Sequence, residues 1–314
     1  MGYAGRDDQG GGSDMRIGLS LYSINEEIKS GRMTLETAIH WAAEQGAQCV
    51  ELVPFSYTFI HDDGSIDHDT INLAVKASRD AGVPLVNYSI LADLCKTDDA
   101  EFESEIARVK RHVDIAAELG LPRMRHDISA FRRPRGENGV QYFEELFPRM
   151  VEAASRISEH AAQYGITTLL ENHGFFANGC DRCERLILAV NRDNYRMLLD
   201  TGNIVCVDED PAVAAKRLAP LCGMIHLKDF YIRHRDPGDT TEFDCAGSWF
   251  RSNHGRYLRG SIMGQGDMDM YEILGTIKEA GYDGDIAIEF EGFEEPKYAS
   301  RVSLDNAKRI WNLV

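Results

Sequence analysis

The chain has 314 residues, 43% of them hydrophobic, and is long enough to bury a sizeable core in one large domain or two ordinary ones. Its formal net charge of −17, from 34 basic and 51 acidic residues, argues against a large contact with nucleic-acid phosphates and favours a small-molecule partner. No stretch approaches the roughly 20 apolar residues that a membrane helix needs. We therefore expect a soluble, cytoplasmic protein without membrane or nucleic-acid partners.

Neither the first residues nor the cysteines point to a function. The opening MGYAGRDDQGGGSD is rich in Gly and Asp, which predicts a flexible leader over 1–14 rather than a signal peptide, and one catalytic domain over 15–314. The seven cysteines are odd in number and scattered, as is typical of reduced thiols. Cys180 and Cys183 form one CxxC, but no second ligand pair at zinc spacing accompanies them, so a zinc site there is disfavoured.

Short apolar runs alternate with longer amphipathic ones along the chain. The amphipathic runs predict helices, the first beginning at a Thr34 N-cap and ending at Gly46. The apolar runs predict eight strands, at 15–23, 49–53, 83–90, 122–129, 166–172, 195–200, 223–229 and 284–292.

Eight βα units in about 300 residues predict a closed (β/α)8 barrel, the TIM barrel, as a single domain. The rival is a doubly wound open sheet, which normally has a Gly-rich phosphate turn after an early strand, and IGLSLYS has none. One region, 230–269, is irregular. In a barrel this long loop after the seventh strand would lie over the carboxyl-terminal mouth, where a substrate lid belongs.

Polar side chains interrupt the ends of the last four strands. They are Glu171, Asp200, His226 and Glu289, one from each strand in chain order. In a parallel barrel these ends meet at one mouth, so the four side chains point at a common volume. Three carboxylates repel one another in a dry pocket, and a divalent cation resolves the repulsion. Three oxygen ligands with one imidazole suit Mn²⁺ first, with Mg²⁺, Co²⁺ or Zn²⁺ as alternatives.

A single carboxylate at a strand end is ordinarily a solvated loop residue or a helix N-cap. For Asp200 the helix-cap interpretation is disfavoured, because TGN follows and no helix start is evident before Pro211. Four such residues on consecutive strands are a much stronger signal than any one of them.

With these residues the chain resembles the xylose-isomerase-like TIM barrels, a superfamily of sugar and sugar-phosphate isomerases and epimerases. The resemblance covers 15–313 and rests on VELVP, LLENHG, LLDTGN, IHLKD, GQGDMD and IEFEG. It implies one divalent metal held by Glu171, Asp200, His226 and Glu289. It also implies that Glu171 and Glu289 face each other across the substrate as acid and base.

Epimerisation beside a carbonyl removes a proton from one face of a carbon and returns one to the other, through an enediolate that needs stabilising charge. An aldose–ketose isomerase or a β-eliminating lyase would use the same proton-transferring groups and the same stabilising charge. Ketose 3-epimerases of the family carry a histidine where this chain has Asn203. The related apurinic endonucleases carry additional histidines that this chain lacks, and its net charge is wrong for DNA.

Further residues are candidate substrate contacts: Arg125, His126, His173, Asn203, Lys228 and Trp249. His126 ends the fourth strand and would be a base or a donor, unless Asp127 satisfies it. Lys228 lies two residues after His226 and faces the same side of the strand. It would neutralise an enolate or a phosphate, unless it pairs with Glu291. His173 is predicted to lie at the rim and bind a sugar hydroxyl.

Arg125 belongs to an arginine-rich stretch with positions 123, 132, 133 and 135, which is either an anion clamp or a solvated loop. Trp249, in the long loop, would stack on a sugar or an aglycone. That loop would equally serve as a dimerisation surface.

We therefore predict a metal-dependent carbohydrate isomerase or epimerase that works through an enediolate. The alternative is a lyase on the same scaffold, either an inosose or dehydroshikimate type of dehydratase or a catalytic subunit that cleaves 3-keto-glycosides or C-glycosides. A non-catalytic sugar-binding barrel is disfavoured by the paired carboxylates. The expected partners are a sugar and further copies of the chain in a dimer or tetramer, or a different subunit.

Overall fold

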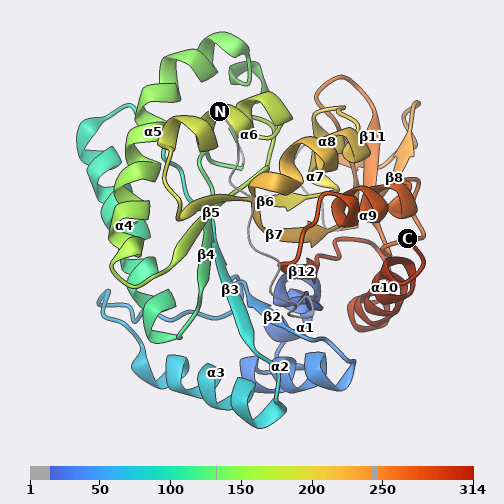
Figure 1. The fold of residues 1–314 in the computed structure, drawn as a ribbon, viewed down its shortest axis with the longest axis horizontal. Coiled ribbons are helices and arrows are strands. Elements are labelled where there is room, and N and C mark those ends of the chain that lie inside the picture. The colour runs from blue at the N-terminus through green and yellow to red at the C-terminus, as the bar shows by residue number, and fades with distance from the viewer. Residues whose placement is uncertain (1–14, 132, 242–246) are drawn as a thin grey trace.

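A closed parallel barrel forms the centre of the protein (Figure 1). The computed structural model describes residues 15–131, 133–241 and 247–314, so the predicted leader over 1–14 lies outside the described residues. The barrel strands, in order around it, are β1 (Ile17–Ser20), β2 (Val50–Leu52), β3 (Leu85–Ile90), β4 (Arg123–His126), β5 (Thr167–Glu171), β6 (Tyr195–Asp200), β7 (Cys222–Leu227) and β12 (Asp285–Ile288). The predicted (β/α)8 barrel is confirmed.

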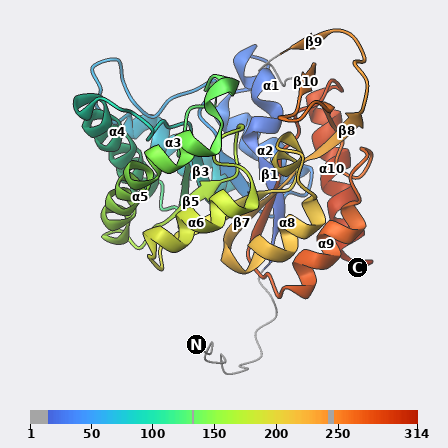
Figure 2. The same cartoon turned by 90° about the horizontal axis from the view of Figure 1, so that it is seen from above.

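Helices surround the barrel (Figures 1 and 2). They are α1 (Asn25–Lys29), α2 (Leu35–Glu44), α3 (His68–Ala81), α4 (Asp99–Glu118), α5 (Val140–Ala162), α6 (Cys180–Val190), α7 (Asn203–Cys206), α8 (Pro211–Leu218), α9 (Met270–Glu279) and α10 (Pro296–Trp311). Thr34 caps α2 as predicted, because its hydroxyl accepts from the backbone N–H of Thr37 at 3.2 Å. The first strand is shorter than predicted, since a 3₁₀ turn, η1 (Leu21–Ile24), follows it. None of the described helices has the length and apolar character needed to cross a membrane.

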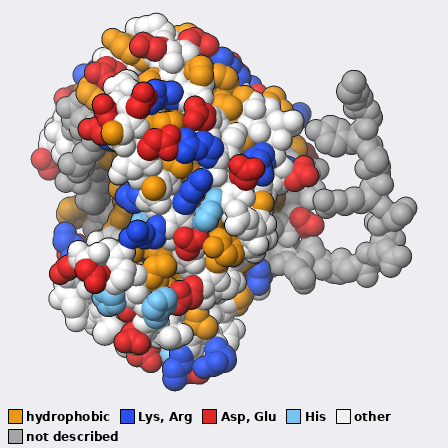
Figure 3. All heavy atoms as spheres, turned by 90° about the vertical axis from the view of Figure 1, so that its left-hand side faces the viewer, with side chains coloured by type: hydrophobic (Ala, Val, Ile, Leu, Met, Phe, Trp, Pro, Cys, Tyr) orange, Lys and Arg blue, Asp and Glu red, His pale blue; other side chains and the backbone are white. Residues whose placement is uncertain are grey.

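The face that contains α4 and α5 carries interspersed acidic and basic side chains (Figure 3). Two ion pairs join these helices, Arg149 to Asp99 at 2.8 Å and Arg156 to Glu103 at 2.6 Å. Such exposed pairs contribute about 0–1 kcal/mol each, so the helices are held mainly by their buried apolar faces.

The region 230–269 is more regular than predicted. Its described part, with Asp229, forms a four-stranded sheet of β8 (Asp229–Arg233), β11 (Tyr257–Ser261), β10 (Trp249–Arg251) and β9 (Thr240–Thr241), in that order. The sheet has its own apolar contact, in which the rings of Phe230 and Phe250 meet edge to face at 5.7 Å. The prediction of an irregular loop was wrong because strands this short give no clear alternation in the sequence.

Side chains fill the barrel in three layers. At the amino-terminal end, Asp285 accepts hydrogen bonds from Arg16 at 2.7 Å and Arg123 at 2.6 Å. Above it lies an apolar layer with one side chain from each of five strands and one from the residue just before β2: Cys49, Val86, Leu169, Leu198, Met224 and Ala287. The third layer is polar and lies at the carboxyl ends of the strands. The polar side chains at the mouth therefore lie directly above this apolar layer, the floor of the mouth, which excludes water.

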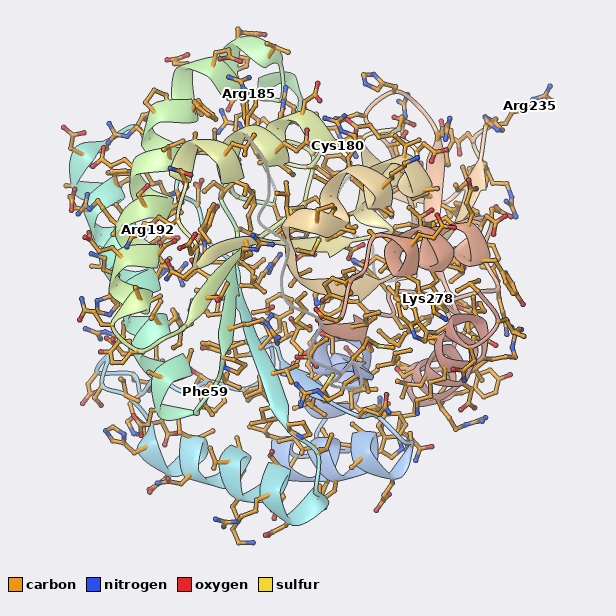
Figure 4. The ribbon with its side chains drawn as sticks, in the orientation of Figure 1. Phe59, Cys180, Arg185, Arg192, Arg235 and Lys278 are labelled. Carbon is orange, nitrogen blue, oxygen red and sulfur yellow. The ribbon has the colours of Figure 1, made fainter. Side chains whose placement is uncertain are left out.

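A partly buried histidine outside the barrel, His112, makes folding sensitive to acid. The Tyr88 hydroxyl lies 2.8 Å from Nδ1 of His112 on α4, beside the ring of Phe59 (Figure 4). Burial, with the nearby Arg108 guanidinium, lowers the pKa of His112 to about 4. The unfolded chain takes up this proton near pH 6.5, so this contribution to stability is complete above that pH and is lost as the pH falls.

We predict that lowering the pH from 7.5 to 5 reduces the free energy of unfolding of the wild type by about 2 kcal/mol more than that of a His112→Gln variant. Urea denaturation at a series of pH values measures the difference. Parallel pH profiles for the two proteins would contradict the prediction.

Candidate active site

The four predicted side chains meet at the mouth of the barrel. Glu171, Asp200, His226 and Glu289 each offer a ligand atom within 4.8 Å of the others. Each stands two positions after an apolar residue of the floor, at 169, 198, 224 and 287. Because side chains alternate along a strand, this spacing turns all four toward the barrel axis. It is the one such cluster among the described residues, and Cys180 and Cys183 are instead buried at the start of α6 (Figure 4).

Asp200 has a second task that corrects the sequence analysis. Its Oδ1 accepts from the backbone N–H groups of Gly202 and Asn203, both at 2.8 Å, at the start of the short helix α7. The structure thus corrects the expectation that no helix begins before Pro211, although the N-cap of α7 is Gly202 and not Asp200. Asn172 fixes the same strand end, since it donates to the Asp200 carbonyl at 2.9 Å and accepts from the Asp200 N–H at 2.8 Å. The other oxygen, Oδ2, has no hydrogen-bond partner among the described residues.

Two buried cations face the carboxylates. Nε of Arg125 lies 2.5 Å from Oε2 of Glu171, and Nη2 lies 2.6 Å from Oδ1 of Asp127. Nζ of Lys228 lies 2.5 Å from Oε2 of Glu289 and 3.0 Å from Glu291. The carboxylates of the mouth outnumber these two cations: Glu51, Asp127, Glu171, Asp200, Glu289 and Glu291. Negative charge is therefore left over in the polar layer.

The surplus charge shifts several pKa values. Burial raises the pKa of Asp200 to about 7, opposed by Lys228 and reinforced by Glu289 and Glu171. Burial also disfavours charge on Glu289, yet Lys228 and His226 hold the pKa of that carboxyl well below its usual range. For His226, burial is outweighed by Glu51 and Glu289, which raise the pKa of the ring well above its ordinary value. The cluster therefore retains protons that a bound cation would displace.

The donor set fits a divalent cation. Asp200 Oδ2 and His226 Nδ1 are buried polar atoms without a hydrogen-bond partner among the described residues. Buried groups of this kind ordinarily have a partner. Three carboxylates and one imidazole are ligands that Mn²⁺, Mg²⁺, Co²⁺ and Zn²⁺ accept.

Four of the predicted substrate contacts lie beside the cluster. Asn203 donates to Glu171 Oε1 at 3.1 Å and accepts from Lys228 at 3.3 Å, while Arg125 contacts Glu171. His173 lies further out, with Nδ1 3.0 Å from Asp127 Oδ1. Its ring stacks in parallel on Phe131 at 4.9 Å. Lys228 combines both roles considered for it, since it reaches the cluster and also pairs with Glu291.

The structure does not bring His126 or Trp249 to the cluster. His126 lies on the opposite side of β4 from Arg125, where its ring stacks on Tyr195 at 6.3 Å and Nδ1 lies 3.0 Å from the Asp127 carbonyl. Burial lowers the pKa of this ring, so it is a neutral core histidine. Trp249 lies in the outer sheet under the guanidinium groups of Arg259 and Arg233, at 5.0 and 5.6 Å from its ring.

Glu51 and Tyr22 also belong to the mouth and were not predicted, whereas Glu291 was predicted as a partner of Lys228. Glu51 is fully buried, and the Tyr22 hydroxyl donates to Glu291 at 2.9 Å. The signal for Glu51 was available, because it interrupts the apolar run CVELV as Glu171 interrupts TTLLE.

We predict that the wild type purifies with about one divalent ion per chain and that the double variant Glu171→Gln/Glu289→Gln loses it, because two anionic ligands disappear. Elemental analysis by mass spectrometry after gel filtration measures the metal. Glu144→Gln, which alters an exposed ion pair with Arg185 (Figure 4), serves as the control and should keep the ion. Full occupancy in the double variant would refute the ligand set.

We further predict that Arg125→Met lowers the free energy of unfolding by about 3–5 kcal/mol, since it leaves Glu171 and Asp127 buried without their cation. Thermal and urea denaturation measure the loss. Arg301→Met, which breaks an exposed pair with Asp305, should change stability by about 1 kcal/mol or less. Equal effects of the two substitutions would show that burial of the pair is unimportant.

Comparisons with known proteins agree with this geometry. A model of the xylose isomerase-like TIM barrel family matches residues 39–310. An inosose dehydratase of Lacticaseibacillus casei is 25% identical over 157 residues, 48% of this chain and 49% of that protein, so the chain spans about half the length of the curated relatives it matches.

Two solved structures share the fold over nearly their whole length. The probable 3-DHS dehydratase AsbF of Bacillus anthracis superposes with a TM-score of 0.71 at 18% identity, over 94% of this chain and 99% of that one. D-psicose 3-epimerase of Clostridium cellulolyticum H10, solved with D-tagatose, gives a TM-score of 0.71 at 14% identity, over 95% and 99%. These low identities establish the fold alone, whereas the family match covers most of the chain. The chain belongs to the xylose isomerase-like TIM barrel family.

Proposed function

We propose that this protein is a divalent-metal-dependent isomerase or epimerase that moves a proton beside the carbonyl of a sugar or sugar-like polyol. The observation that carries the proposal is the buried cluster of Glu171, Asp200, His226 and Glu289. Around the barrel the two glutamates flank the other two residues, because β5 and β12 lie on either side of β6 and β7. Two carboxylates so placed are the parts that a proton transfer between two faces of a carbon requires.

Each glutamate has one oxygen fixed and one directed at the centre. Oε2 of Glu171 is held by Arg125 and Oε2 of Glu289 by Lys228, both at 2.5 Å. The Oε1 atoms lie 3.7 and 3.8 Å from Nδ1 of His226. In the proposed reaction one glutamate takes the proton and the other returns one, while Lys228 and Asn203 bind substrate oxygens. A divalent cation, Mn²⁺ as our first candidate, supplies the positive charge that stabilises the negative charge developing on the substrate.

A neutral, unphosphorylated substrate fits the charges of the mouth. Arg125 and Lys228 are already engaged by carboxylates. In the loop after β4, Arg133 pairs with Glu137 and lies 4.6 Å above the Phe176 ring, and Arg135 donates to backbone carbonyls of the outer sheet. A phosphate would have to displace one of these partners, so the described arginines and lysines favour hydroxyl groups over an anion. The clamp predicted for the arginine-rich stretch thus gains no support from its described members.

A lyase is the second candidate, and the match with an inosose dehydratase favours it. Elimination begins with the same proton removal and additionally needs an acid for the leaving group. Among the described residues, His173 is a group of suitable chemistry at the rim, held by Asp127 and with its side chain 22% exposed.

We predict that the metal-loaded protein incorporates deuterium beside the carbonyl of a neutral substrate in D₂O, and that Glu171→Gln and Glu289→Gln each slow this by about 10²-fold or more. Proton NMR on a panel of ketoses, inososes, 3-keto-glycosides and their phosphates measures the exchange, with Glu144→Gln as the control.

The products separate the candidates. Release of water or of an aglycone would establish the lyase, and exchange confined to phosphorylated substrates would contradict the neutral-substrate argument. No exchange across the whole panel would leave a sugar-binding barrel.

A further inference from the structure

A fifth carboxylate touches the cluster from the side of β2. Glu51 is completely buried, and its Oε1 accepts from Asn87 Nδ2 at 2.7 Å and from Ser89 Oγ at 2.6 Å. Its Oε2 lies 2.8 Å from Nε2 of His226. Strands β2 and β7 are separated by β1 and β12 around the barrel, so this contact crosses the interior. The four-residue cluster gives Glu51 no role.

The 2.8 Å distance between Glu51 Oε2 and His226 Nε2 indicates which ring nitrogen carries a proton. A carboxylate oxygen and an imidazole lone pair repel at 2.8 Å, so a proton must lie between Oε2 and Nε2. The two atoms are not aligned as a regular hydrogen bond, but Oε1 is already supplied by Asn87 and Ser89 and Oε2 needs a donor. His226 Nε2 is therefore the protonated nitrogen.

The other nitrogen is then available to a ligand. Neither ring nitrogen has a hydrogen bond of regular geometry among the described residues, but Nε2 lies 2.8 Å from a carboxylate oxygen, whereas Nδ1 lies 3.7 Å from Glu171 Oε1 and 3.8 Å from Glu289 Oε1. The ring is 1% exposed, so water does not readily supply a partner.

We propose that Glu51 is a positioning residue that holds His226 with its proton on Nε2, so that His226 binds the divalent cation through Nδ1. The inference rests on the metal-dependent function proposed above. A carboxylate behind a ligating histidine fixes its ring and raises its basicity, and losing such a partner typically weakens metal binding by about 10–100-fold.

Calorimetric titration of Mn²⁺ into metal-stripped protein tests the energetic part. Glu51→Gln should bind Mn²⁺ about 10–100-fold more weakly than the wild type. Ser89→Ala is the matched control, since it removes one donor to Oε1 and leaves the contact with His226, and should change the affinity less than about threefold. Thermal unfolding of each metal-free variant reports whether the barrel is intact. Equal affinities of Glu51→Gln and wild type would overturn the inference.

Nitrogen-15 NMR of the wild type tests the tautomer without any variant at Glu51. In protein labelled at histidine and loaded with Zn²⁺, His226 should show a directly bonded proton on Nε2 and none on Nδ1, with His226→Gln used for assignment. A proton on Nδ1 would overturn the inference and leave the proposed function standing. Failure of the wild type to bind any divalent ion would overturn both.

Discussion

Repulsion among carboxylates held on a dry floor is the constraint that organises this mouth. Two like charges about 4 Å apart repel by about 4 kcal/mol at an effective dielectric constant near 20. The apolar layer that includes Cys49 and Ala287 excludes water from below the polar layer. Among the residues that the structure describes, Arg125 and Lys228 are the buried arginine and lysine within the polar layer. They contact Glu171, Asp127, Asp200, Glu289 and Glu291, so two cations face five of the carboxylates. Burial, reinforced by Glu289 and Glu171, raises the pKa of Asp200 in spite of Lys228. The four clustered side chains could hold a divalent cation, which would supply the missing counter-charge.

The same constraint explains why every candidate ligand has its own anchor. Glu171 is held by Arg125, Glu289 by Lys228, and Asp200 by backbone N–H groups at the start of α7. His226 has Glu51 behind it. Each anchor fixes one atom of its side chain, while Asn203 also donates to Glu171 Oε1 and Lys228 Nζ lies 3.3 Å from Asp200 Oδ2. A cation that binds here meets side chains whose conformational entropy has already been lost, which favours tight binding in one geometry.

The length of each element determined how much of the fold and of the candidate site could be predicted from the sequence. The four strand-end residues were predictable because a period of two and a parallel barrel together fix their direction. The short helix α7 was not predicted because its four residues leave no periodicity. For His126 two interpretations were open, and the structure favours a histidine satisfied by Asp127, because adjacent residues of β4 face opposite sides and Arg125 faces the mouth. The ion pairs of Lys228 could not be predicted in full. They depend on distances between strands, and the residue pattern of a single strand carries no information on those distances.

Proton removal beside a carbonyl is common to epimerisation and elimination, so the cluster by itself does not choose between them. The groups between Glu171, Glu289 and the rim of the mouth would decide between epimerisation and elimination. Arg125 connects the cluster to the rim, because it contacts both Glu171 and Asp127. Asp127 in turn holds His173 at the rim. Strand residues locked by buried partners tolerate little change, whereas rim loops can vary without disturbing the barrel. The segments after β4 and β5 and the outer sheet after β7 are therefore where the reaction class of this chain is decided.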